Sequence, residues 1–289
     1  MGGRRIEVIG HGGVRLSALT WGGGPDDQPG AVLLLHDLLG CAAQWEDTAR
    51  RLAGTRRVLA LDQRGHGRSG PPADGREDRA ACVDDVLAVV DALGSPHVTL
   101  VGHGTGAVTA WQVAGARPEA VGGLVVCDAR AAAWGGGAQR DWYDWCRSWP
   151  VPFGSREEAR RWYATEDPTL RAASPGRGAA LATALVAGEG GLVPALTGRR
   201  PAAVRESWTR DAHWDELARV CCPTLVVRGP EGELGRAEAQ EMVRVLPRGA
   251  YAEIADTGHW LPWERPEAWT AAVRSFLDAA VTPAGGVCR

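Results

Sequence analysis

The clearest chemical signature lies in the stretch LVGHGTGAV at positions 100–108. Two glycines, Gly102 and Gly106, have the spacing of a sharp strand-to-helix turn that presents a catalytic serine. The central position of this turn is Gly104. Glycine tolerates the strained backbone of such a turn, but it carries no hydroxyl, thiol or carboxylate. A covalent intermediate at position 104 is therefore impossible.

The elements that must position this turn are predicted by the rest of the sequence. Short apolar runs alternate with amphipathic stretches, which indicates a mostly parallel sheet with crossover helices. The segment 4–24 predicts an N-terminal hairpin, and the long gap between 128 and 224 predicts an inserted helical cap. The predicted strands are 31–37, 57–62, 97–102, 123–128, 224–229 and 250–256, and the predicted cap helices lie in 139–149, 155–166, 176–189 and 200–220.

Five stretches together resemble the α/β-hydrolase family, in its cap-bearing branch of esterases, epoxide hydrolases, dehalogenases and C–C hydrolases. They are LLLHDLLG (33–40), LALDQRGHGRS (59–69), LVGHGTGAV, PTLVVRG (223–229) and IADTGHWLPWERPEAW (254–269), in the family's order. The resemblance covers residues 31 to about 280. It implies an α/β-hydrolase core at 1–130 and 215–289 and a cap at 131–214.

The resemblance implies a histidine and an oxyanion hole. His259 matches the family's catalytic histidine, and a neutral imidazole moves protons near neutral pH. The backbone N–H groups of Leu38 and Thr105 match the two oxyanion-hole donors. Asp37 replaces the glycine that is common after His36, and it is predicted to brace the loop or to act as a general base.

The carboxylate that orients His259 is displaced in this sequence. The family places it beyond PTLVVRG, where this chain has Gly232. The resemblance implies an alternative location at the end of the preceding predicted strand, which here is Asp128, and this is the first choice, because an acid there can approach the histidine from the neighbouring strand end. Glu231 and Glu233 flank the usual position and are the alternatives.

A set of aromatic residues is predicted to line the substrate pocket. Tryptophan combines a large apolar face with one hydrogen-bond donor, so it suits an aromatic ligand, although tryptophans on cap helices also serve simply to bury those helices. The pocket candidates are His103, Trp45, Trp142, Trp145 and Trp260.

The composition restricts the partners. The net charge of −3 and the lack of a basic stripe argue against nucleic acid as a partner. The sequence has no long apolar segment, so we expect neither a membrane anchor nor a secretion signal. The seven cysteines have no metal-type spacing, so they are predicted to be free thiols in a reducing, cytoplasmic compartment. The glycine-rich turn lacks the residues of a phosphate loop or dinucleotide site. We therefore expect a monomer or homodimer that binds a small hydrophobic substrate without metal or cofactor.

Three functions fit these residues. The first is a non-hydrolytic enzyme in which His259 transfers protons during cyclisation, elimination, ring opening or cofactor-free oxygenation, in a setting such as bacterial natural-product biosynthesis. The second is a hydrolase of esters, lactones or epoxides in which His259 activates water. The third is a ligand-binding protein that has lost catalysis. The first is the leading hypothesis.

Overall fold

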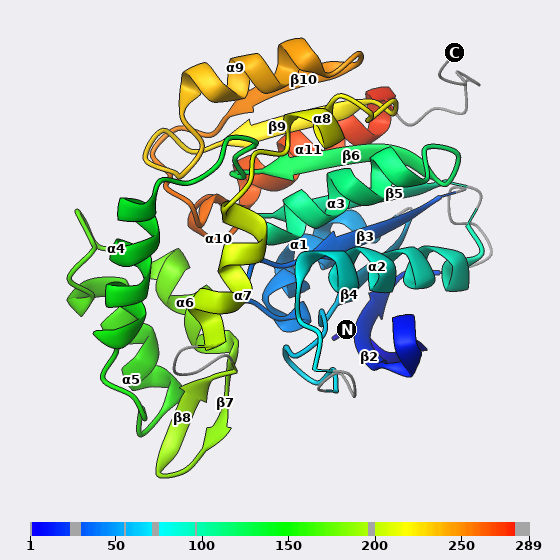
Figure 1. Ribbon diagram of the computed structural model, residues 1–289. Coiled ribbons are helices and arrows are strands. Elements are labelled where there is room, and N and C mark those ends of the chain that lie inside the picture. Colours follow the sequence, from blue (N-terminus) through cyan, green and yellow to red (C-terminus); the bar gives the residue numbers. More distant parts are fainter. Residues whose placement is uncertain are drawn as a thin grey trace.

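An eight-stranded sheet forms the centre of the protein (Figure 1). The structure is a computed structural model that describes residues 2–23, 30–54, 56–70, 75–95, 97–195 and 200–280. The strand order is β1-β2-β4-β3-β5-β6-β9-β10, antiparallel up to β4 and parallel from there on. The strands are β1 (Arg4–Ile9), β2 (Arg15–Trp21), β3 (Ala31–Leu35), β4 (Arg57–Leu61), β5 (Val98–His103), β6 (Val121–Cys127), β9 (Thr224–Arg228) and β10 (Gly249–Glu253).

Two hydrophobic cores cover the two faces of the sheet. Side chains alternate along a strand, so Leu33 and Leu35 of β3 enter one core while Val32 and Leu34 enter the other. Because the central strands are buried on both faces, their sequences are continuous apolar runs. This is why they could be predicted from the sequence. The first face is covered by α2 (Arg79–Leu93), α3 (Thr105–Ala116), α8 (Trp214–Leu217) and α9 (Arg236–Val245), and the second by α1 (Glu46–Leu52) and α11 (Pro266–Ala280).

The chain between β6 and β9 forms a largely helical segment beside the sheet, at the lower left of Figure 1. Trp149, Phe153 and Tyr163 form part of a core that joins it to Leu39 and Trp260 of the sheet domain. The division into a core and a separate cap at 131–214 stays a prediction. Its elements are α4 (Gly136–Arg147), α5 (Arg156–Arg161), a π-helical turn (Trp162–Glu166), α6 (Pro175–Thr183), β7 (Leu185–Gly188), β8 (Gly191–Pro194) and α7 (Arg200–Thr209).

The predicted fold class and the six predicted core strands are confirmed, and the N-terminal hairpin forms β1 and β2. Two cap predictions are wrong. The helix predicted over 176–189 ends at Thr183, and the chain continues into the β7–β8 hairpin, whose turn includes Gly190 with φ of 77°. The helix predicted over 200–220 is divided into α7 and α8, which are separated by His213 and the residues before it.

Among the cysteines in the described ranges, one departs from the prediction; Cys288 lies outside these ranges. Cys41, Cys82, Cys127, Cys146 and Cys222 are free, but Cys221 is disulfide-bonded. The described helices include none that is long and apolar enough to cross a bilayer.

Candidate active site

Gly104 lies in the turn between β5 and α3, as the sequence predicts. Its backbone has φ of 52° and ψ of −122°, a conformation in which any side chain is strained. A Cβ atom built on Gly104 would also overlap the Asp37 carboxylate. The space that a nucleophilic side chain needs at this turn is therefore filled by a different residue.

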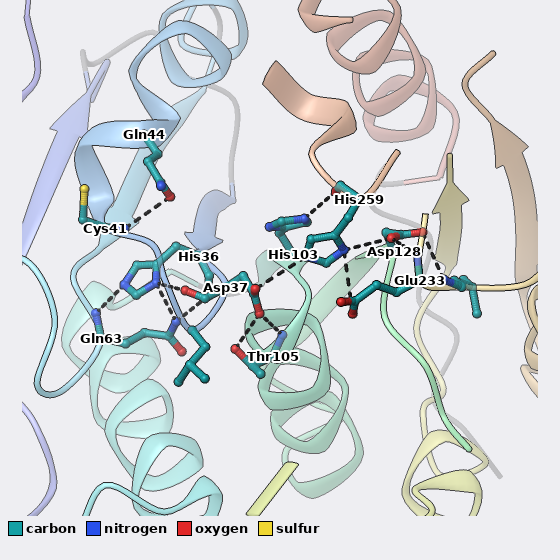
Figure 2. Close-up of polar contacts among 12 residues, drawn as sticks. His36, Asp37, Cys41, Gln44, Gln63, His103, Thr105, Asp128, Glu233 and His259 are labelled. Atoms are coloured by element: carbon teal, nitrogen blue, oxygen red, sulfur yellow. Dashed lines mark hydrogen bonds and ion pairs between the residues drawn. The ribbon is translucent and has the colours of Figure 1, made fainter. Parts of the chain in front are cut away.

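Asp37 extends from the loop that follows β3 toward Thr105 and His259 (Figure 2). Its Oδ1 accepts hydrogen bonds from the Thr105 N–H at 2.7 Å and from the Thr105 hydroxyl at 2.9 Å. Its Oδ2 lies 3.5 Å from Nε2 of His259. The Thr105 N–H, predicted to be free for a substrate oxyanion, is thus engaged by a carboxylate of the protein itself.

The loop that carries Asp37 is held by a buried histidine. His36 Nδ1 donates to the carbonyl oxygen of Asp37 at 2.7 Å, and its Nε2 accepts from the backbone N–H of Gln63 at 3.0 Å. Burial, aided by the neighbouring His66, lowers the pKa of His36 to about 3, so the ring stays neutral and can fill both roles. Leu38 is buried in the same loop, and its carbonyl oxygen lies 2.5 Å from Nε2 of His66.

Asp128 follows β6 and orients the histidine. Its Oδ2 lies 2.9 Å from Nδ1 of His259 and accepts the backbone N–H of Glu233 at 2.7 Å. The backbone of Asp128 has a positive φ of 45°, and its side chain is fully buried. A Cβ atom on Gly232 would overlap this carboxylate. The structure therefore brings Asp128 and His259 together, as the sequence predicts, in the space that the missing acid at position 232 would occupy.

His259 lies between two carboxylates, which favours a proton on each of its nitrogens. Burial acts to lower the pKa of His259, but the negative charges of Glu233, Asp128 and Asp37 outweigh it and hold the pKa well above its ordinary range. Burial likewise acts to raise the pKa of Asp37, but the hydrogen bond and charge of His259 hold that pKa well below its ordinary range. The resting site is an imidazolium flanked by carboxylates.

Two further groups touch this ion pair. Glu233 lies 3.9 Å from Nδ1 of His259, and burial raises the pKa of its carboxyl. His103 lies against His259 with ring centroids 4.4 Å apart, and its Nε2 donates to the His259 carbonyl oxygen at 2.8 Å. Burial lowers the pKa of His103 to about 4. His103 is therefore a neutral support for His259.

We expect the His259 imidazole to titrate at a lower pH when Asp37 is replaced by asparagine, because one of its anionic neighbours is removed. The ordinary pKa values are 6.5 for His259 and 3.8 for Asp37. Since the first is raised and the second lowered, the pair stabilises the fold fully between these values. That stability is lost as pH rises through the raised pKa or falls through the lowered one. NMR titration of the His259 ring in both proteins measures the shift, and identical titrations would contradict the pairing.

A small cavity opens beside Asp37 and Gly104. Its volume of about 30 Å³ is enough for about two water molecules. Trp142, Glu233 and Arg205 are among the residues that line it. A larger groove of about 790 Å³ runs past His259 and Trp260, between the His259 loop and residues 169–177 of the cap segment.

The other predicted pocket residues lie elsewhere. Trp45 is fully buried against Trp263 and Trp269, with ring centroids 5.2 and 6.3 Å away. Trp145 donates to Asp167 at 2.7 Å inside the cap segment. These two side chains and His103 line neither the cavity nor the groove.

Two further points concern the acids and the cavity wall. The Glu231 side chain is 64% exposed, and it forms an ion pair with Arg171 at 3.0 Å rather than approaching His259. Arg205, in α7, was not anticipated, because an arginine on a predicted amphipathic cap helix is normally a solvated one. The hydrogen bond from the Thr105 hydroxyl to Asp37 was also not predicted.

Comparison with known proteins identifies the family of this chain. The family model for the alpha/beta hydrolase fold matches residues 30–266, so the chain belongs to the α/β-hydrolase family. It is 25% identical over 294 residues to 2-(acetamidomethylene)succinate hydrolase of Mesorhizobium japonicum, a match that covers 96% of this chain and 95% of that protein. It is 38% identical over 103 residues to epoxide hydrolase B of Mycobacterium tuberculosis, a match that covers 35% of this chain and only 29% of that relative.

Solved structures agree on the fold. The crystal structure of E-2-(acetamidomethylene)succinate hydrolase superposes with a TM-score of 0.80 at 23% identity, covering 96% of this chain and all of that one. The enol-lactonase from Burkholderia xenovorans LB400 gives a TM-score of 0.73 at 20% identity, over 94% of this chain and all of that one. These relatives are named as hydrolases, and none is named as a lyase or cyclase.

Proposed function

We propose that this protein is a hydrolase in which Asp37 is the nucleophile, acting on small hydrophobic molecules with a strained, electrophilic carbon such as an epoxide. The observation that carries the proposal is the position of the Asp37 carboxylate, which fills the side-chain space of Gly104. There it faces both the Thr105 N–H and the His259 imidazolium. A carboxylate is an established type of covalent nucleophile.

In the first step, Asp37 Oδ2 attacks an epoxide carbon and the carbon–oxygen bond of the ring breaks. The ring oxygen takes the proton that His259 Nε2 holds beside Asp37, and His259 becomes neutral. The product is an ester on Asp37. Because the pKa of Asp37 is low, its carboxylate is a weak nucleophile, which restricts the substrates to reactive electrophiles.

The second step depends on the change of charge at Asp37. Once Asp37 is an ester, His259 has lost an anionic neighbour, so its pKa falls and its imidazole stays neutral. Neutral His259 can then take a proton from water, and the hydroxide attacks the Asp37 carbonyl carbon. The oxyanion forms on Oδ1, where the Thr105 N–H and hydroxyl already donate. Collapse expels the diol, which takes its proton from His259, and the acid proton of Asp37 restores the imidazolium.

This charge state argues against the leading hypothesis from the sequence. The raised pKa of His259 favours the protonated imidazole in the resting enzyme, and a protonated imidazole does not begin catalysis as a base, either toward a substrate or toward water. The named relatives, being hydrolases, also favour hydrolysis over cyclisation or elimination. The earlier idea of a His259-activated water survives as the second half of the mechanism.

Labelled water tests the proposal. Styrene oxide is incubated with an excess of enzyme in H₂¹⁸O, and the diol and the peptide containing Asp37 are analysed by mass spectrometry. We expect an unlabelled diol from the first turnover and ¹⁸O in the Asp37 carboxylate, because the diol oxygen comes from the protein. Label in the diol at the first turnover would show direct attack by water and overturn the proposal. Absence of turnover across epoxides and activated esters would favour a binding protein.

A further inference from the structure

Arg205 is a buried cation in the wall of the cavity above Asp37. It is 4% exposed, and its Nη1 donates to Oε1 of Gln139 at 2.8 Å. Within the described ranges, no carboxylate lies at ion-pair distance from its guanidinium. A guanidinium carries five N–H donors, so most of its hydrogen-bonding capacity is unused by these residues.

Two indole rings fix the plane of this guanidinium. The Arg205 Cζ atom lies 4.3 Å from the ring centroid of Trp134 and 5.0 Å from that of Trp142. Such contacts hold the planar group in one orientation, which reduces the entropy lost when a ligand binds to it. Burial lowers the pKa of Arg205, against the opposing charges of Glu233 and Asp37. A bound anion would offset the cost of this burial.

Arg130, a second arginine in the wall of the same cavity, differs from Arg205 in having an ion-pair partner. It also lines the cavity and lies over Trp134, with its Cζ 5.1 Å from the ring centroid. Its Nε, however, forms an ion pair with Glu238 at 2.8 Å. The charge of Arg130 is therefore compensated inside the protein, whereas that of Arg205 is held in place without an ion-pair partner among the described residues.

We propose that Arg205 binds a carboxylate group of the substrate, so that this enzyme acts on small aromatic or apolar acids whose electrophilic carbon lies toward Asp37. The position of the reacting carbon rests on the proposed function, whereas the carboxylate-binding role of Arg205 does not depend on it. Arginine binds carboxylates through two parallel hydrogen bonds, and Trp134, Trp142 and Trp208 supply an apolar wall beside it. Because the cavity is small, side chains of α4 and α7 must move as such a substrate enters.

A binding measurement tests the carboxylate site without any turnover. Calorimetry compares phenylacetate with phenylacetamide at pH 7, since the two differ in charge but hardly in shape. We expect the wild type to bind the acid at least about 10-fold more tightly than the amide, and Arg205→Met to remove this preference. Arg205→Lys, which keeps the charge but not the planar fork, should retain part of it. Arg130→Met is the matched control and should keep the full preference.

Three results would overturn the proposal. They are equal binding of the acid and the amide by the wild type, no saturable binding of phenylacetate up to about 10 mM, and an equal loss of preference in Arg205→Met and Arg130→Met. If Arg205→Met does not fold, as judged by circular dichroism, Arg205→Lys decides: an unchanged preference for the acid overturns the proposal, and a reduced one supports it.

A turnover measurement separates this proposal from the proposed function. The specificity kcat/KM is compared for 3-phenylglycidate, an epoxide that carries a carboxylate, and for its amide. A preference for the acid of at least about 10-fold that Arg205→Met removes supports both ideas. Turnover of both epoxides without a preference overturns the role of Arg205 alone. Selective binding of phenylacetate with no turnover of either epoxide overturns the nucleophile and leaves the carboxylate site supported.

Discussion

Replacing Asp37 by asparagine is expected to reduce kcat/KM for an epoxide substrate at least about 10³-fold while the protein stays folded. The amide is nearly isosteric and its oxygen can still accept the Thr105 N–H, so the loop should keep its conformation. It cannot form the ester, however, so only substrate binding and acid catalysis would remain. Steady-state kinetics and thermal unfolding of the two proteins measure the two effects separately.

A surface change serves as the matched control for this prediction. Asp84 lies on α2 with 41% of its side chain exposed, and its carboxylate lies 3.9 Å from Nε2 of His11. Asp84→Asn removes the same charge without touching the site and should leave kcat/KM unchanged. Activity of Asp37→Asn within about 10-fold of the wild type would show that Asp37 braces the loop, as its residue type alone suggests.

Restoring a serine at position 104 is expected to give esterase activity only when Asp37 is shortened as well. In Gly104→Ser alone, the new side chain overlaps the Asp37 carboxylate and adopts a strained backbone conformation that costs about 1–3 kcal/mol. In Gly104→Ser/Asp37→Gly, the hydroxyl gains the vacated space next to His259, and the Thr105 N–H becomes available to an oxyanion. The double variant then has a serine hydroxyl, His259 and Asp128 side by side in the order of a Ser-His-Asp triad.

Hydrolysis of p-nitrophenyl acetate measures this gain. We expect the double variant to exceed Asp37→Gly by at least about 10²-fold and to react with a fluorophosphonate, because only it carries an activated hydroxyl. Adding His259→Ala should abolish both reactions. Equal activity of Gly104→Ser with and without Asp37→Gly would mean that Asp37 does not occupy the space of the nucleophile.

The positions of His259 and Asp128 were predicted from the resemblance to the α/β-hydrolase family, and the sheet explains why the two residues meet. Apolar runs identify the buried parallel strands, and the carboxyl ends of parallel strands converge at one edge of the sheet. Asp128 follows β6 and His259 follows β10, and β9 lies between these two strands in the sheet. Asp128 was preferred over Glu231 because the end of β6 is the family's alternative location for the acid, from which a carboxylate can approach the histidine.

The role of Asp37 could not be predicted in the same way. Aspartates in loops usually brace the backbone, and nothing in the residues around Asp37 shows that its side chain turns toward Gly104. That orientation depends on the absence of a side chain at a position 67 residues away in the sequence. The charge of His259 was missed for the same reason, since it results from three carboxylates that come from different loops.

The segment between β6 and β9, which the sequence predicts to be a cap, was predicted least well, because its helices and strands depend on contacts within the segment. The β7–β8 hairpin continues directly from α6 and is paired with Phe153 through Leu192. Leu185–Gly188 has the composition of either a helix end or a strand, so tertiary pairing decides between them. Arg205 is likewise placed by contacts with Trp134 and Trp142 that no local pattern reveals.

The two glycines, Gly104 and Gly232, are related by how the sheet is ordered. In the order β3-β5-β6-β9, the side chain missing after β5 is supplied from the end of β3, and the one missing after β9 is supplied from the end of β6. Each carboxylate thus comes from the strand next to the one that carries the glycine, on the same side of it in both cases. An evolutionary path that changes one position at a time would pass through proteins with two side chains in one space, or none. Positions 37 and 104, and positions 128 and 232, should therefore covary as pairs among relatives that share this arrangement.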